Sequence, residues 1–137
     1  MSSQKTEHYR LHQWVPKDNF IRSEFNENFG AIDTALAAAS RVVAGTYTGN
    51  GDASRLIVLG FQPKAVLLTD ESGEMRYGYY CYGGLALPGH PVRLNESLVS
   101  LSVEENGFRV YYLSNNGTSW KLFTNSSGSL FHYLAFY

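Results

Sequence analysis

The first part of the chain has the hydrophobic spacing of one amphipathic helix. Over residues 18 to 40 the apolar positions recur at intervals of four, three, four and three residues: Phe25, Phe29, Ile32, Leu36 and Ala39. This spacing places them along one side of a helix. Asp18 or Ser23 is expected to cap the helix start, because a short oxygen-bearing side chain accepts hydrogen bonds from the free amides of the first turn.

Two interpretations of this apolar stripe stay open from the pattern alone. An amphipathic helix usually packs its stripe on its own domain. The alternative is a parallel bundle formed with further copies of the chain. A stripe of about three heptads is too short to hold an isolated coiled coil together, so such a bundle needs additional contacts.

From Arg41 onward the pattern changes to short strands separated by turns. The predicted strands are Val42–Thr48, Leu56–Leu59, Ala65–Thr69, Glu74–Tyr82, Ser97–Val103, Phe108–Leu113, Trp120–Phe123 and Leu130–Phe136. Gly83–Pro91 is rich in glycine and proline and is expected to be a loop, whereas Asn106-Gly107 is a strong hairpin signal. The chain is therefore expected to be mainly β, with an N-terminal helix followed by an antiparallel sandwich or small barrel.

The domain organisation follows from the same change of pattern. Residues 1–40 are expected to be an extended tail and a helix, and residues 41–137 an antiparallel β domain. The last predicted strand is apolar on both faces, which indicates a central strand or a strand with one face against a partner chain. We expect part of Leu130–Tyr137 to lie at a subunit contact.

The composition of the chain limits which classes of molecule it is expected to bind. The chain has 137 residues and a formal net charge of -1, which argues against nucleic acid and against anionic membranes. Cys81 is the single cysteine, so an internal disulfide is excluded and a buried thiol is expected. The first residues lack the apolar core of a signal peptide, and no stretch is long enough to span a bilayer. Synthesis in the cytoplasm without a signal peptide is the expectation.

Two groups of residues give the chain a resemblance to known proteins. Trp14–Asp18 and Phe25–Leu36, which reads Phe-Asn-Glu-Asn-Phe-Gly-Ala-Ile-Asp-Thr-Ala-Leu, resemble the start of many phage tail and tail-fibre proteins. The rest resembles a small β domain of phage and prophage minor structural proteins, through Gly45–Gly51, Ile57–Leu67, Gly107–Val110 and Tyr133–Phe136. The resemblance covers nearly the whole chain.

The resemblance implies a homotrimeric fibre or baseplate component of a virion or phage-like particle tail. The N-terminus would attach to other tail or baseplate proteins and leave the β domain exposed. Four stripe residues are then expected to meet at a common axis and hold the trimer together: Phe25, Phe29, Ile32 and Leu36.

Catalytic and metal-binding patterns are missing from the sequence. There is no Gly-x-Ser-x-Gly, no His-Glu-x-x-His and no phosphate-binding loop ending in Lys-Ser or Lys-Thr. The acid pairs Asp70-Glu71 and Glu104-Glu105 lie in predicted turns, where carboxylates are usually solvated, and a glycosidase needs two acids across a cleft. We therefore expect no enzymatic activity, no metal and no cofactor.

The positive candidates for binding are aromatic and amide side chains in and near the loops: Tyr79, Tyr82, Asn115, Asn116 and Trp120. Aromatic rings stack on the apolar faces of sugars, and amides both donate to and accept from hydroxyl groups. About half of the tyrosines in Tyr77–Tyr82 are expected to face the core instead. The loops Gly83–Pro91, Ser114–Ser119 and Thr124–Ser129 carry little charge, which suits a neutral glycan.

The leading hypothesis is a tail-fibre or tail-tip protein that binds a bacterial surface receptor, a glycan or a protein, through its β domain. One alternative is a purely structural tail or baseplate spacer or adaptor without a receptor. Another is a free soluble lectin, and a small hydrolase is the last.

Overall fold

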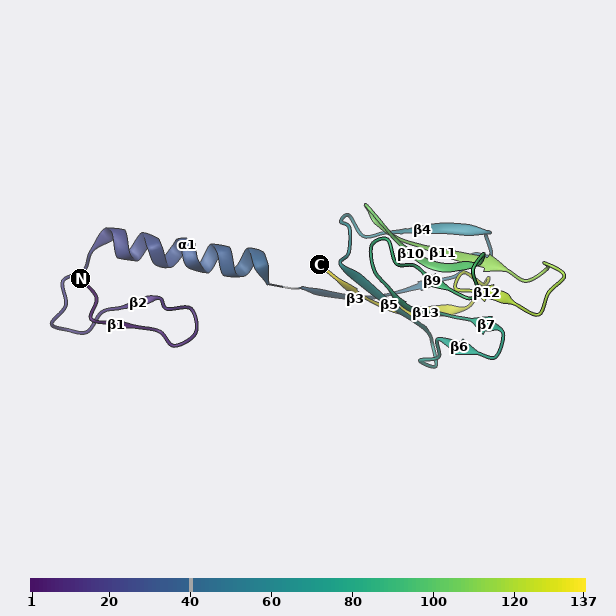
Figure 1. The fold of residues 1–137 in the computed structure, drawn as a ribbon, viewed down its shortest axis with the longest axis horizontal. Coiled ribbons are helices and arrows are strands. Elements are labelled where there is room, and N and C mark those ends of the chain that lie inside the picture. The colour runs from purple at the N-terminus through teal and green to yellow at the C-terminus, as the bar shows by residue number, and fades with distance from the viewer. Residues whose placement is uncertain (40) are drawn as a thin grey trace. The chain divides into compact units, whose positions relative to one another are not determined.

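The computed structural model describes residues 1–39 and 41–137. The chain forms two compact units, Met1–Ser40 and Arg41–Tyr137 (Figure 1). Ser40, the final residue of the range predicted to be helical, lies outside the described residues. Within the described residues the chain is mainly β with one helix, as the pattern predicted.

The N-terminal unit is a small hairpin beside a helix. Strands β1 (Gln4–Lys5) and β2 (His12–Gln13) pair antiparallel, and helix α1 spans Arg22–Ala38. The expectation of an extended tail before the helix is therefore wrong. The tail folds back because helix side chains bind its backbone: Asn28 Oδ1 accepts from His12 N at 2.6 Å, and Asn28 Nδ2 donates to His12 O at 2.9 Å.

The start of α1 differs from the prediction. The residue before the helix is Ile21, and no side chain caps it. Asp18 does not serve as the cap because its Oδ2 atom already accepts hydrogen bonds from Val15 N at 3.0 Å and Ser3 N at 2.9 Å. These hydrogen bonds lower the pKa of the Asp18 carboxyl below its usual value. The aspartate therefore fastens the hairpin instead of the helix.

The surface of α1 is inverted relative to an ordinary amphipathic helix: a polar side of the helix faces its own unit, and the apolar side faces solvent. Glu24 is buried, Asn28 and Ala35 are half-buried, and every other helix residue is exposed. The exposed set includes Phe29 and Leu36, with 56% and 60% of their surface open. The hairpin therefore covers a polar side of the helix and leaves the apolar stripe uncovered.

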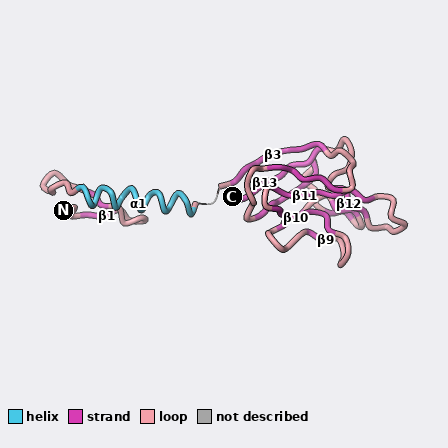
Figure 2. Tube along the Cα trace, turned by 90° about the horizontal axis from the view of Figure 1, so that it is seen from above, coloured by secondary structure: helices cyan, strands magenta, loops and turns pink. Residues whose placement is uncertain are grey.

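The C-terminal unit contains two sheets packed on each other (Figure 2). Its strands are β3 (Val42–Thr48), β4 (Ser54–Val58), β5 (Ala65–Asp70), β6 (Arg76–Tyr77), β7 (Tyr80–Cys81), β8 (Gly84–Ala86), β9 (Val92–Arg93), β10 (Val99–Glu104), β11 (Gly107–Leu113), β12 (Lys121–Phe123) and β13 (Leu130–Phe136). One sheet has the order β3-β13-β5-β8. The other has the order β6-β7-β12-β11-β10-β9, and β4 also pairs with β11. The architecture is sandwich-like.

The core lies between the two sheets. Val66, Leu68, Phe131 and Ala135 of the four-stranded sheet are fully buried, and they meet Phe108, Val110 and Leu101 of the other sheet. Each strand contributes alternate residues, as the pleat requires. A smaller cluster contains Leu94, Leu122 and Cys81, so the expectation of a buried thiol is confirmed.

The structure departs from the predicted strands in the region 74–93. The predicted strand Glu74–Tyr82 is a tight hairpin, β6–β7, because Gly78 turns the chain with a φ of 54°. The predicted loop Gly83–Pro91 contains β8, which pairs with β5. Strand β7 then runs parallel to β12, so the pairing is not antiparallel throughout.

Candidate functional site

The loop Ser114–Ser119 projects from the end of the β unit opposite its C-terminus (Figure 1). Beside this loop, Tyr79 and Trp120 pack edge to face, with ring centroids 4.8 Å apart. The guanidinium of Arg76 lies 5.9 Å from the centre of the Trp120 ring. Tyr79 is 53% exposed, whereas Trp120 is half-buried, so the pair offers one accessible aromatic edge.

The two predicted asparagines of this loop have different roles. Asn116 Nδ2 donates to Trp120 O at 2.9 Å, and Lys121 Nζ donates to Asn116 Oδ1 at 3.0 Å. Lys121 also binds the backbone oxygen of Ser114. These bonds make Asn116 a brace of the loop. Asn115 is exposed and is the asparagine whose amide faces solvent.

Tyr82 belongs to a second aromatic group, centred on Phe123. The ring of Phe123 lies 5.4 Å from Tyr80, 5.8 Å from Tyr82 and 5.9 Å from Tyr112. These rings come from neighbouring strands, because β12 pairs with both β7 and β11. The five residues predicted to bind a ligand therefore fall into two aromatic groups instead of one.

Tyr82 also lines a polar pocket of about 210 Å³. The other residues at its wall are Asp70, Glu71, Gly128, Ser129, Leu130 and Phe131. The pocket exists because the end of β5 lies beside the start of β13, where Asp70 is in register with Phe131. It combines an aromatic wall with two carboxylates and a hydroxyl group.

The electrostatics of this polar pocket favour hydrogen bonding to hydroxyl groups. Burial, followed by the nearby charges of Glu74 and Asp70, raises the pKa of Tyr82, which therefore keeps its hydroxyl proton as a donor. Burial alone would raise the pKa of Asp70. Hydrogen bonds from Ser72, Glu74 and Gly73 outweigh this effect and lower it, so the carboxylate stays charged. A donor and an acceptor thus lie on the same wall.

Asp70 and Glu71 were not among the predicted binding residues, whereas Ser129 lies in the loop Thr124–Ser129 that was expected to suit a glycan. Asp70 was interpreted as a solvated turn residue, and its Oδ1 atom does hold the turn by accepting from Ser72 N at 2.9 Å and Glu74 N at 2.8 Å. The signal that places it beside Tyr82 is the pairing of β5 with β13. That pairing joins segments about 60 residues apart, which local patterns do not encode.

The loop Thr124–Ser129 is less open than expected. Thr124 and Asn125 are fully buried. Thr124 Oγ1 donates to Ser100 O at 2.7 Å and accepts from Tyr111 N at 2.8 Å. This hydroxyl therefore bridges the backbones of β10 and β11. Only the second half of the loop, from Ser127 to Ser129, is exposed to a ligand.

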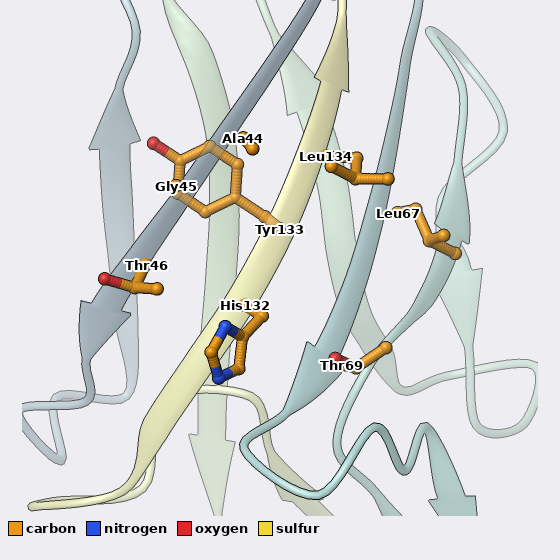
Figure 3. A pocket seen from close by; sticks show the side chains of 8 residues that line it. All are labelled: Ala44, Gly45, Thr46, Leu67, Thr69, His132, Tyr133 and Leu134. Carbon is orange, nitrogen blue, oxygen red and sulfur yellow. The ribbon is translucent and has the colours of Figure 1, made fainter.

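A hollow of about 410 Å³ lies on the outer face of the four-stranded sheet (Figure 3). Strands β3, β13 and β5 line it with Ala44, Thr46, His132, Leu134, Leu67 and Thr69, together with Gly45 and Tyr133. The surface of its walls is mostly apolar, although two threonines, His132 and Tyr133 are among the lining residues. This surface suits an apolar partner better than a sugar.

A line of polar groups in the N-terminal unit has the residue types of a catalytic triad. Ser2 Oγ lies 2.6 Å from His12 Nδ1, and His12 Nε2 lies 2.9 Å from Glu27 Oε2. Hydrolysis would also need free amide groups for an oxyanion. Ser2 N instead donates to Glu24 at 2.8 Å and Ser3 N to Asp18 at 2.9 Å. The arrangement fits a structural clasp between hairpin and helix.

Metal and membrane signals are weak in the part of the chain that the structure describes. In residues 1–39 and 41–137, no group of three or more His, Cys, Asp or Glu side chains is arranged to hold a metal ion. Helix α1 does not have the length and apolar character that crossing a bilayer requires. Comparison with protein-family profiles, with curated proteins and with solved structures found no match.

Proposed function

We propose that this chain is a non-enzymatic, homotrimeric component of a phage or phage-derived tail, in which the β unit binds a bacterial surface glycan. The observation that carries the proposal is the inverted surface of α1. This helix buries Glu24 against its own hairpin and leaves Phe25, Phe29, Ile32 and Leu36 between 39% and 60% exposed. An apolar stripe of this kind needs a partner, and copies of the same helix offer a matching stripe.

The family resemblance of the N-terminal stretch supplies the rest of this proposal. Tail and tail-fibre proteins that begin with a similar pattern use the N-terminus for attachment and assembly. By that analogy the N-terminal unit joins other tail or baseplate proteins, and the β unit faces the bacterial surface. The trimeric state is part of the same analogy.

Glycan binding is supported by the polar pocket beside Tyr82. Its volume of about 210 Å³ is below the usual range for drug-sized ligands, so it fits a single sugar ring. Tyr82 offers a ring and a donor, and Asp70 offers an acceptor. Such a shallow site binds in the millimolar to micromolar range. Three copies on one fibre raise the avidity without any new contact.

A structural spacer is the second candidate, and one observation favours it. The aromatic residues near the loops pack largely on one another, and Asn116 is engaged in hydrogen bonds within its own loop. A surface whose polar and aromatic groups are already paired has less to offer a ligand.

Two measurements test the proposal. Sedimentation equilibrium of the full chain should give three times the monomer mass. A glycan array and binding to bacterial envelopes should then give a signal that Tyr82→Phe weakens about two- to tenfold, the usual effect of one lost hydrogen bond. Tyr77→Phe, at an exposed position in the preceding strand, is the matched control and should bind normally.

Each alternative has its own outcome. A monomer at micromolar concentration would contradict the trimeric part of the proposal. A trimer that binds no glycan and no envelope would identify the structural spacer. Binding that is identical in the wild type and Tyr82→Phe would remove the polar pocket from the receptor site.

A further inference from the structure

The outer face of the four-stranded sheet is an apolar surface without a covering element in its own unit. The residues that point outward alternate with the core residues along each strand. They are Val42, Ala44, Thr46 and Thr48 of β3; Leu130, His132, Leu134 and Phe136 of β13; Ala65, Leu67 and Thr69 of β5; and Leu85 of β8. None of these described positions holds Lys, Arg, Asp or Glu. We call this set the outer sheet face.

The register aligns the outer sheet face in rows across the strands. Ala44, Leu134, Leu67 and Leu85 form one row, and Thr46, His132 and Thr69 form the next. Small side chains at Ala44 and Thr46 leave the hollow of about 410 Å³ between larger neighbours (Figure 3). Leu85 on the edge strand β8 is 56% exposed, and Leu134 on the inner strand β13 is 37% exposed.

The lack of charged side chains limits which molecules can bind the outer sheet face. A charged or strongly hydroxylated ligand would lose hydration here and find few partners, because the polar side chains that line the hollow are two threonines, one histidine and one tyrosine. An apolar protein surface loses nothing comparable. Copies of this same face are suitable partners, because neutral surfaces do not repel one another.

The size of the outer sheet face decides between a separate protein and a second copy. Four strands about 4.8 Å apart, each about five residues long with a rise of about 3.4 Å per residue, cover a flat area of roughly 300 Å². A stable complex of independent proteins buries about 800 Å² on each partner. A flat footprint of this size is small for the stable capture of an independent protein. It is large enough to close against a copy that is already held nearby.

We propose that the outer sheet face is buried against other copies of this chain, as a second assembly surface besides helix α1. This inference rests on the proposed function, because the helices must first bring the copies together. The β units then contribute an apolar contact around the same axis. Assembly through two surfaces explains how a helical stripe of only about three heptads can suffice.

The first test measures access to the outer sheet face in the intact protein. Thr46→Cys places a thiol in the hollow, and Ser127→Cys places one in an exposed loop as the control; both are made with Cys81→Ala. In the oligomer, maleimide should label the cysteine at 46 at least about tenfold more slowly than the one at 127. The protection should disappear when Phe29→Asp is added. Equal labelling of both sites in a confirmed oligomer would overturn the inference and leave the proposed function intact.

The second test measures assembly and does not depend on a cysteine. Leu85→Lys should raise the dissociation constant of the oligomer about tenfold or more, because the ammonium would be buried without a partner. Val58→Lys is the matched control, since Val58 is 63% exposed on the other sheet, and it should change the constant less than twofold. Equal effects of the two substitutions would contradict the inference. A wild-type chain that is monomeric would refute both this inference and the trimeric proposal.

Discussion

Asn125 and Asn50 bind each other through their side chains, although 75 residues separate them in the chain. The amide of Asn125 donates to Asn50 Oδ1 at 2.7 Å, and Asn125 Oδ1 accepts from Asn50 N at 3.2 Å. Asn125 Nδ2 also donates to the backbone oxygen of Asp52. One fully buried amide therefore fastens the turn after β3 to the loop before β13.

This pairing predicts a loss of stability for Asn125→Ala. The substitution removes three hydrogen bonds of a fully buried amide, and at a net value of about 0.5–1.5 kcal/mol each we expect a loss of about 1–3 kcal/mol of unfolding free energy. Asn115→Ala, at an exposed asparagine, should change stability by less than about 0.5 kcal/mol. Chemical denaturation of both variants measures the difference. Similar midpoints for the two variants would show that the buried amide does not hold the loops together.

The burial of Tyr47 predicts how the free energy of unfolding changes with pH in alkaline solution. Burial raises the pKa of this tyrosine well above its usual value, and the hydroxyl donates to Thr124 O. The unfolded chain releases the phenolic proton above about pH 10, whereas the folded chain keeps it. Stability contributed by Tyr47 is thus complete below about pH 10 and falls as the pH rises further.

The measurement compares Tyr47→Phe with the wild type between about pH 8 and 11. The wild type should lose up to about 1.4 kcal/mol per pH unit more than the variant above the unfolded-state pKa. Tyr77→Phe, at an exposed tyrosine, should leave the slope unchanged. Parallel slopes for the wild type and Tyr47→Phe would mean that Tyr47 ionises equally in both states.

The strands of the β unit illustrate what sequence patterns can and cannot predict. The first and last strands, Val42–Thr48 and Leu130–Phe136, match the structure residue for residue. Their β-branched and aromatic runs end at clear turn signals. The predicted strand Glu74–Tyr82 fails because the pattern of aromatic residues continues through Gly78, where the backbone reverses. Composition does not reveal which glycine turns the chain.

The candidate sites show a similar limit. Local pattern identified Tyr82 and Trp120 as aromatic candidates beside the loops, yet it gave no means of grouping them. The groups depend on strand pairing: β12 brings Phe123 to Tyr80 and Tyr112, and β13 brings Ser129 to Asp70. Likewise, the sequence could not predict that Asp18 would bind Ser3 and leave the helix uncapped. Each of these outcomes needs contacts between distant segments.

The hydrogen bonds of Glu24 predict that this side chain holds the N-terminal hairpin on the helix. Its buried Oε2 atom accepts from Ser2 N at 2.8 Å and from Trp14 Nε1 at 3.1 Å. In Glu24→Leu both donors lose their acceptor, so the hairpin should open more often and the Trp14 indole proton should exchange at least about tenfold faster. Glu27→Gln changes the exposed carboxylate beside His12 and serves as the control. Hydrogen exchange followed by NMR measures both. Unchanged exchange in Glu24→Leu would mean that Asn28 and Asp18 hold the hairpin without it.

A substitution of Phe29 tests the role of the apolar stripe in assembly most directly. It is 56% exposed in the single chain, and its ring packs edge to face on Phe25 at a centroid distance of 4.8 Å. If three stripes meet at one axis, Phe29→Asp brings three carboxylates together in an apolar environment without cations. Their mutual repulsion and the loss of hydration should dissociate the trimer into folded monomers at micromolar concentration.

Asn26→Asp is the matched control for Phe29→Asp, because it adds the same charge at an exposed helix position outside the stripe. Sedimentation equilibrium should give a trimer for Asn26→Asp and a monomer for Phe29→Asp. Circular dichroism should show that the β unit stays folded in both, since its core of Phe108, Phe131 and Leu68 contains no residue of α1. If Phe29→Asp remains trimeric, the stripe does not lie at the axis. Contacts outside the stripe would then hold the copies together, and the exposed phenylalanines would be free to bind another protein of the particle.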